Sequence, residues 1–159
     1  MLNLLSRSWM LLFLLVASVA LSVAFASVRV QLDGAMLDFM MNGTQARAHL
    51  ASMSPEQKDT HFWATVLHDT AYPLAYGGFL IGAIWRFGGD LRKWFVVPAI
   101  AAPFLDLFEN FVQALALSGN ATFLGLKSLL TPAKFGCIFL AFVLLVTCLG
   151  IAGYKRLRA

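Results

Sequence analysis

Hydrophobic residues gather into four long runs along the chain, and polar residues fill the segments between them. Each run holds about 20 mostly apolar residues, the length that an α-helix needs to cross about 30 Å of hydrocarbon. The runs lie at about residues 9–28, 62–85, 94–117 and 135–153. We therefore expect an all-α integral membrane protein, a four-helix bundle in which residues 1–159 form a single membrane domain.

The composition supports a membrane protein. Hydrophobic residues make up 60% of the chain and charged residues only 13%, whereas soluble domains are about half apolar and about a quarter charged. The runs leave no room for a soluble catalytic domain. The net charge is +4, but the basic residues lie beside the ends of the runs rather than in a patch, so we expect no nucleic-acid partner.

The basic residues also predict an orientation. Arg7 precedes the first run, a loop rich in Arg and Lys joins the second to the third, and the C-terminal tail is basic. Alternating spans put these segments on one side, which the positive-inside rule makes the cytoplasm. We expect a multi-pass protein of the bacterial inner membrane with both termini cytoplasmic. Ala24-Phe25-Ala26 fits a signal-peptidase site, but a run of spanning length favours an uncleaved anchor.

Residues 29–61 form a polar outer loop between the first two runs. Four apolar residues recur at helical spacing after Asp33-Gly34, namely Met36, Leu37, Met40 and Met41. This spacing predicts a short amphipathic helix. We favour a helix lying at the membrane surface, and the alternative is a lid over the bundle.

Two signals predict where later helices begin. In Ser54-Pro55-Glu56-Gln57 the serine can cap a helix, the proline suits its first position and the glutamine can complete a capping box. The second helix should therefore begin outside the membrane. Thr131-Pro132 is a similar but weaker start for the fourth helix.

Polar side chains inside the second and third runs need an explanation, because a carboxylate near the bilayer centre costs about 2.5 to 3.5 kcal/mol on insertion scales. In the second run, one helical face holds Asp69, Tyr72, Pro73 and Tyr76. In the third run, the same spacing recurs at Asp106, Glu109, Asn110 and Gln113. Two polar stripes cannot both face lipid, so we expect them to face each other or a cavity.

Depth along the helices predicts which of these groups meet. Asp69 and Glu109 lie about 10 and about 12 Å below the outer boundary, and Lys134, at the start of the fourth run, can extend its side chain toward Glu109. We expect these three residues to form one network. Since one cation then meets three acids, at least one of Asp106 and Glu109 should keep its proton at neutral pH.

Two prolines make the same region less regular. Pro73 frees the backbone carbonyl of Asp69, and Pro103 frees that of Ala99, because proline has no N–H to donate. Irregular backbone at membrane depth is tolerated where it is buried in protein or lines a wet cavity. A simple packing kink is the alternative.

Two motifs carry a resemblance to a known family. The first, D-x-x-[YF]-P-x-x-Y-G, runs from Asp69 to Gly77, and the second, D-x-x-E-N, runs from Asp106 to Asn110. Together with the span opened by a lysine, this part of the chain resembles an uncharacterised family of small bacterial four-span membrane proteins. The resemblance implies the four-span architecture and no activity.

Motifs for other chemistry are weak. His61 and His68 share a helical face, but their spacing is too wide for one metal ion without further ligands. Nucleotide, haem and hydrolase signatures do not occur in the sequence. We therefore expect no metal and no cofactor.

Three functions fit these features. In the first, which we favour, the polar network orders the bundle of a non-enzymatic accessory or scaffold subunit. In the second, an intramembrane pocket binds, isomerises or otherwise transforms an amphipathic lipid, quinone or isoprenoid, with Asp106 or Glu109 as the candidate catalytic acid. In the third, an oligomer conducts protons or ions. Expected partners are membrane lipids and either another membrane protein or further copies of the chain.

The space between the second and third runs distinguishes these functions. A closed, fully bonded network favours an ordering role, and an apolar pocket that reaches the acids favours a ligand. A continuous wet path favours conduction.

Overall fold

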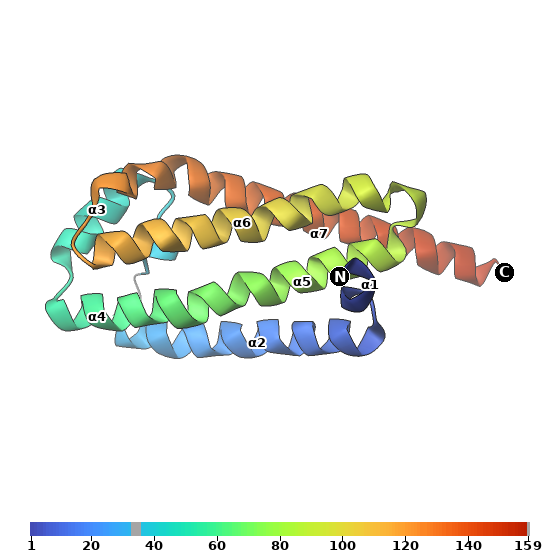
Figure 1. Cartoon of the computed structure of the whole chain (residues 1–159), viewed down its shortest axis with the longest axis horizontal. Coiled ribbons are helices and arrows are strands. Elements are labelled where there is room, and N and C mark those ends of the chain that lie inside the picture. The colour runs from blue at the N-terminus through green and yellow to red at the C-terminus, as the bar shows by residue number, and fades with distance from the viewer. Residues whose placement is uncertain (33–35, 159) are drawn as a thin grey trace.

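The structure is a computed structural model that describes residues 1–32 and 36–158. Within these ranges the chain is almost entirely helical and contains no strand, which confirms the predicted all-α class. Four long helical runs of the described residues lie side by side along the longest axis of the molecule (Figure 1).

The runs are longer than the hydrophobic pattern predicts. The α-helices are α1 (Leu2–Leu5), α2 (Ser8–Gln31), α3 (Gly43–Ser52), α4 (Pro55–Trp63), α5 (Thr70–Phe87), α6 (Arg92–Leu117) and α7 (Lys127–Leu157). Three 3-10 turns lie in the connections, η1 (Leu37–Phe39), η3 (Gly89–Leu91) and η4 (Thr122–Leu126). A π-helical turn, η2 (Ala64–Asp69), joins α4 to α5 in one continuous run.

Within residues 1–32 and 36–158, three helical segments are long and apolar enough to cross a membrane, namely Ser8–Gln31, Gly89–Leu117 and Thr122–Leu157. The predicted second span is helical but is not among them, because glycines, a proline and tyrosines dilute the apolar residues of α5. In α2, apolar residues predominate, yet none of its residues is buried. A helix that is apolar on all sides requires an apolar environment around it.

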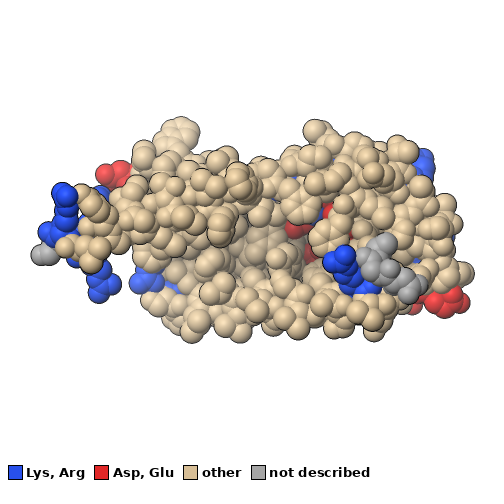
Figure 2. Space-filling view, turned by 180° about the vertical axis from the view of Figure 1, so that it is seen from behind, with Lys and Arg blue, Asp and Glu red and all other residues tan. Residues whose placement is uncertain are grey.

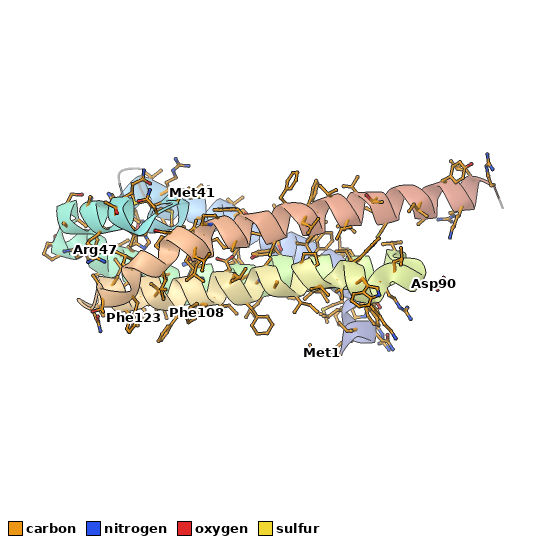
Figure 3. All side chains as sticks on the ribbon, turned by 90° about the horizontal axis from the view of Figure 1, so that it is seen from above. Met1, Met41, Arg47, Asp90, Phe108 and Phe123 are labelled. Atoms are coloured by element: carbon orange, nitrogen blue, oxygen red, sulfur yellow. The ribbon has the colours of Figure 1, made fainter. Side chains whose placement is uncertain are left out.

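The third run has its polar face inward. Asp106, Glu109 and Gln113 of α6 are buried, whereas Phe104 is 70% exposed and Phe108 is 49% exposed. Figure 3 shows Phe108 on the outside of the helices. A water-soluble helix has the opposite pattern, so the environment of α6 is apolar on the outside.

The packing of the helices leaves one side open. α5 contacts α2, α6 and α7, and α6 packs along α7. Within the described residues α2 and α7 share no extensive contact. Two glycines of α5 lie against the N-terminal helices, with Gly78 facing Leu14 and Gly82 facing Leu5.

The end of the molecule that carries α3 is closed by the loop after α2, and we call it the α3 end. The six-residue amphipathic helix predicted around Met36 to Met41 is wrong, because this segment forms only the single turn η1, with Leu37 and Asp38 buried. Contacts with His61 and Gln113 hold the turn inward. The segment therefore matches the lid alternative. The helix of this loop is α3, and Asp33-Gly34 lies outside the described residues.

The two predicted helix starts have different outcomes. The capping box at Ser54 is confirmed, since Ser54 Oγ accepts from the Gln57 N–H at 3.2 Å and Gln57 Oε1 accepts from the Ser54 N–H at 2.9 Å. α7 begins at Lys127 instead of Thr131, and Pro132 lies inside it. Figure 3 shows α7 curved near this end, as a proline inside a helix produces. Asp90 lies at the opposite end of the molecule from Arg47 (Figure 3).

Candidate functional site

A cavity of about 520 Å³ lies between α2 and α7, with α5 and α6 behind it. Its walls are apolar and include Leu15, Phe25, Phe79, Phe135, Ile138 and Phe142. Polar residues gather toward the α3 end, namely Asp38, Asp69, Tyr72, Tyr76, Asp106 and Lys134. Figure 2 shows this hollow in a largely uncharged face, with carboxylate atoms visible inside it. We call it the lateral cavity.

A chain of alternating charges runs behind the cavity from α7 to α5. Lys127 is ion-paired with Glu109 Oε1, and Lys134 Nζ lies 2.7 Å from Glu109 Oε2. Lys134 Nζ also lies 2.9 Å from Asp106 Oδ1, and Tyr76 donates its hydroxyl to Asp106 Oδ2 at 2.9 Å. Thr131 donates to Glu109 Oε1 at 2.6 Å. Every member is at least nine-tenths buried, so water screens these pairs weakly.

Lys127 changes the charge count of this network. It is completely buried and was not predicted, because it precedes the predicted fourth span. The sequence does hold a signal for it, since Lys127, Thr131 and Lys134 are spaced to share one helical face. With two lysines facing Asp106 and Glu109, the reason to expect a proton on one of these acids is removed.

A second cluster, which we call the lid cluster, contains Asp69 and joins the turn η1 to the long helices. Lys134 is ion-paired with Glu109 but not, among the described residues, with Asp69, so the predicted triad is divided. Its carboxyl instead contacts that of Asp38 in η1. Gln113 donates to Asp38 Oδ1 at 3.0 Å. Asp38 was missed because nothing in the periodicity of a loop shows which residue turns inward.

Asn110 has a backbone partner. Its side-chain amide donates to the carbonyl of Asp69 at 2.6 Å. This carbonyl is the one that Pro73 leaves without a helical donor. The irregular backbone at η2 and Pro73 is therefore buried in protein and hydrogen-bonded across to α6.

His61 is neutral in this arrangement. Its Nε2 accepts from the Leu37 N–H at 3.0 Å, so the ring proton is on Nδ1, 3.1 Å from Thr65 Oγ1. Burial lowers the pKa of His61, and the Asp38 carboxylate 4.0 Å away opposes this only in part. Burial raises the pKa of Asp38, but the hydrogen bond with Asp69 and the charges of Lys134 and Lys127 outweigh this effect and lower the pKa to about 2.

These shifts predict that the protein becomes less stable on acidification. Below pH 6.5, the ordinary pKa of histidine, the unfolded chain takes up a proton that buried His61 resists, so stability falls by up to about 1.4 kcal/mol per pH unit. Thermal unfolding in detergent from about pH 7.5 to about pH 5.5 measures this. His61→Gln should flatten the profile, since the amide can still accept from Leu37. Parallel profiles for the two proteins would contradict the assignment.

Polar side chains do not continue to the other end of the molecule. Among the described residues, the half beyond Tyr76 and Asp106 is filled by an apolar cluster that includes Ile84, Val96 and Leu145. A continuous polar path along the helices is therefore missing from the described part of the chain.

Seven of the eight predicted polar residues thus separate into two neighbouring groups at the α3 end, and the eighth is Tyr72. Tyr76, Asp106, Glu109 and Lys134 belong to the charge chain, and Asp69, Asn110 and Gln113 belong to the lid cluster. Tyr72 lines the cavity with its ring 5.1 Å from that of Tyr76. The two histidines have different neighbours, since His68 packs on Phe25 of α2.

Comparisons with protein-family models, with curated proteins and with solved structures find no match to this chain. The resemblance to the four-span family stays an expectation. A function has to be inferred from the chain's own geometry.

Proposed function

We propose that this chain is a four-span protein of the bacterial inner membrane that binds one amphipathic lipid in the lateral cavity, without transforming it. The observation that carries the proposal is the cavity of about 520 Å³, apolar along its walls and polar at one end. Binding sites for small molecules have volumes of about 300 to 1,000 Å³ and, like this cavity, mostly apolar walls with a few polar groups. The walls suit a hydrocarbon chain, and the polar end suits a head group.

The span of this proposal that is less apolar than the other three is the second predicted run, residues 62–85, within α4–η2–α5. It lies alongside α2 and α6, which are long and apolar enough to cross a membrane. Its buried polar residues Asp69 and Tyr76 line the lateral cavity and do not face the surrounding bilayer. The basic loop around Asp90 and the C-terminus lie at the end opposite α3 (Figure 3), and the positive-inside rule puts that end in the cytoplasm.

The site favours binding over catalysis or conduction. Asp106 and Glu109, the candidate acids, are each ion-paired with a lysine, so their carboxyl oxygens are engaged by the protein's own donors. Conduction would need polar groups through the apolar half of the helices, where the described residues supply none.

A second candidate is the accessory subunit favoured from the sequence. The ion pairs between α6 and α7 are closed and suit an ordering role. The apolar surface of α2, which has no buried residue, would then lie against a membrane-protein partner or a second copy of the chain.

Filling the cavity tests the proposal. Native mass spectrometry of gently extracted protein should show one retained lipid on the parent. Ile138→Trp places a ring in the cavity and should reduce retention at least about tenfold, because the ring occupies part of the path that the hydrocarbon chain needs. Ile151→Trp, on the exposed outside of the same helix, is the matched control and should retain the lipid.

Two outcomes would reject the lipid site. One is a parent that carries no lipid, and the other is Ile138→Trp with undiminished retention. A protein retained in place of a lipid would favour the accessory subunit.

A further inference from the structure

The polar end of the lateral cavity holds more negative than positive charge. The buried acids there are Asp38, Asp69, Asp106 and Glu109, and the buried lysines of the described residues are Lys127 and Lys134. Both lysines are engaged by Glu109 and Asp106. His61 is neutral, and Arg29, whose guanidinium lies over the Phe39 ring at 5.8 Å, is exposed at the rim. The excess negative charge therefore belongs to Asp38 and Asp69.

Two oxygens of this pair have no hydrogen-bond donor outside the pair itself among the described residues. Asp38 is 8% exposed and Asp69 is 6% exposed, and both line the cavity. Asp38 Oδ2 and Asp69 Oδ2 receive no hydrogen bond from an N–H or hydroxyl of the described residues. One proton shared between the carboxyls can join them, but it leaves a negative charge in an apolar cavity, which is costly unless a cation compensates it.

The surroundings of the pair suit a cation. Tyr72 lies at the same end of the cavity, with its ring 6.0 Å from that of Phe25. The electron-rich faces of aromatic rings attract ammonium groups. The hydroxyls of Ser18 and Ser22 are occupied by carbonyls of α2 itself, so these residues do not supply donors for an anion.

We propose that the lipid in this cavity carries a protonated amine in its head group, and that Asp38 and Asp69 bind it together. This inference rests on the lipid-binding function proposed above. An ammonium supplies N–H donors for both unbonded oxygens and cancels the excess charge. A neutral hydroxyl head group would donate a hydrogen bond to this pair but would leave its negative charge uncompensated. An anionic head group would be repelled by the same charge, and both buried lysines of the described residues are already ion-paired.

Three probes with the same hydrocarbon chain test the head group, namely dodecylamine, dodecanol and dodecanoate. They are titrated against the detergent-solubilised full chain at neutral pH, with bound probe counted by native mass spectrometry. We expect dodecylamine to bind at least about tenfold more tightly than the other two, because only it pairs with a buried charge. Ile138→Trp should reduce binding of dodecylamine and dodecanol alike.

Variants that replace one carboxylate by an amide then show which residues cause the preference for the amine. Asp69→Asn and Asp38→Asn keep the side-chain volume and should each reduce the preference for amine over alcohol at least about tenfold, while dodecanol still binds. Asp59→Asn removes an exposed acid at the same end of the molecule and should leave the preference unchanged. The two lid-cluster variants are independent, so one that fails to fold leaves the other as the test.

The possible failures can be told apart. Equal binding of the three probes to the parent, or an unchanged preference in a folded Asp69→Asn or Asp38→Asn variant, overturns the head-group inference and leaves the lipid site standing. If no probe binds and the parent retains no lipid, the proposed function itself is overturned.

Discussion

Lys127→Met is expected to lower the free energy of unfolding by about 3 to 5 kcal/mol, because it leaves Glu109 with one lysine where the structure supplies two. Lys127 and Glu109 are each 0% exposed, so water cannot replace the lost partner. Reversible unfolding in detergent micelles measures the loss.

A double variant distinguishes the loss of the Lys127–Glu109 ion pair from a general disturbance of the packing. Adding Glu109→Gln to Lys127→Met should recover most of the stability, since replacing both members of a buried ion pair is often nearly neutral. Lys93→Met removes an exposed lysine near the opposite end of the molecule and should change little. If Lys127→Met unfolds like the parent, Glu109 is not a buried carboxylate that depends on this lysine.

Gly77→Val is expected to destabilise the protein by about 1 to 3 kcal/mol or more, through forced separation of α5 and α6. A Cβ at Gly77 would lie 2.7 Å from Cγ of Pro103, a contact that requires one helix to move. Because Tyr76 precedes Gly77, the same movement should lengthen its 2.9 Å hydrogen bond to Asp106. Thermal unfolding in detergent measures the combined loss.

A glycine in open space provides the control for that experiment. A Cβ at Gly136 of α7 would have no neighbour within 4 Å. Gly136→Ala should therefore be neutral or stabilise by up to about 1 kcal/mol, because alanine favours helix over glycine. Equal losses for both variants would show that the position of Gly77 is not special.

The inward face of α6 could be read from the sequence because a regular helix has a fixed period. Asp106, Glu109 and Gln113 all turn inward, and the chain carries no interruption between them. Lys134 could also be assigned to Glu109, since both lie at the same depth.

The partners of Asp69 could not be found in the same way. The turn η2 departs from α-helical geometry just before this residue, and no residue type in Ala64–Asp69 announces a π turn. Asp38 lies in a loop whose inward position depends on contacts with His61 and Gln113, distant in sequence. Long-range contacts of this kind do not appear in a local pattern.

The cavity lies between α2 and α7, and this position would determine how the proposed lipid arrives. A molecule that enters sideways from the bilayer never has to expose its hydrocarbon chain to water, so exchange needs neither a soluble carrier nor a long gate along the helix axes. Its supply is then set by the composition of one leaflet and by diffusion in two dimensions. With the acidic residues toward the α3 end, the proposed topology makes that leaflet the outer one.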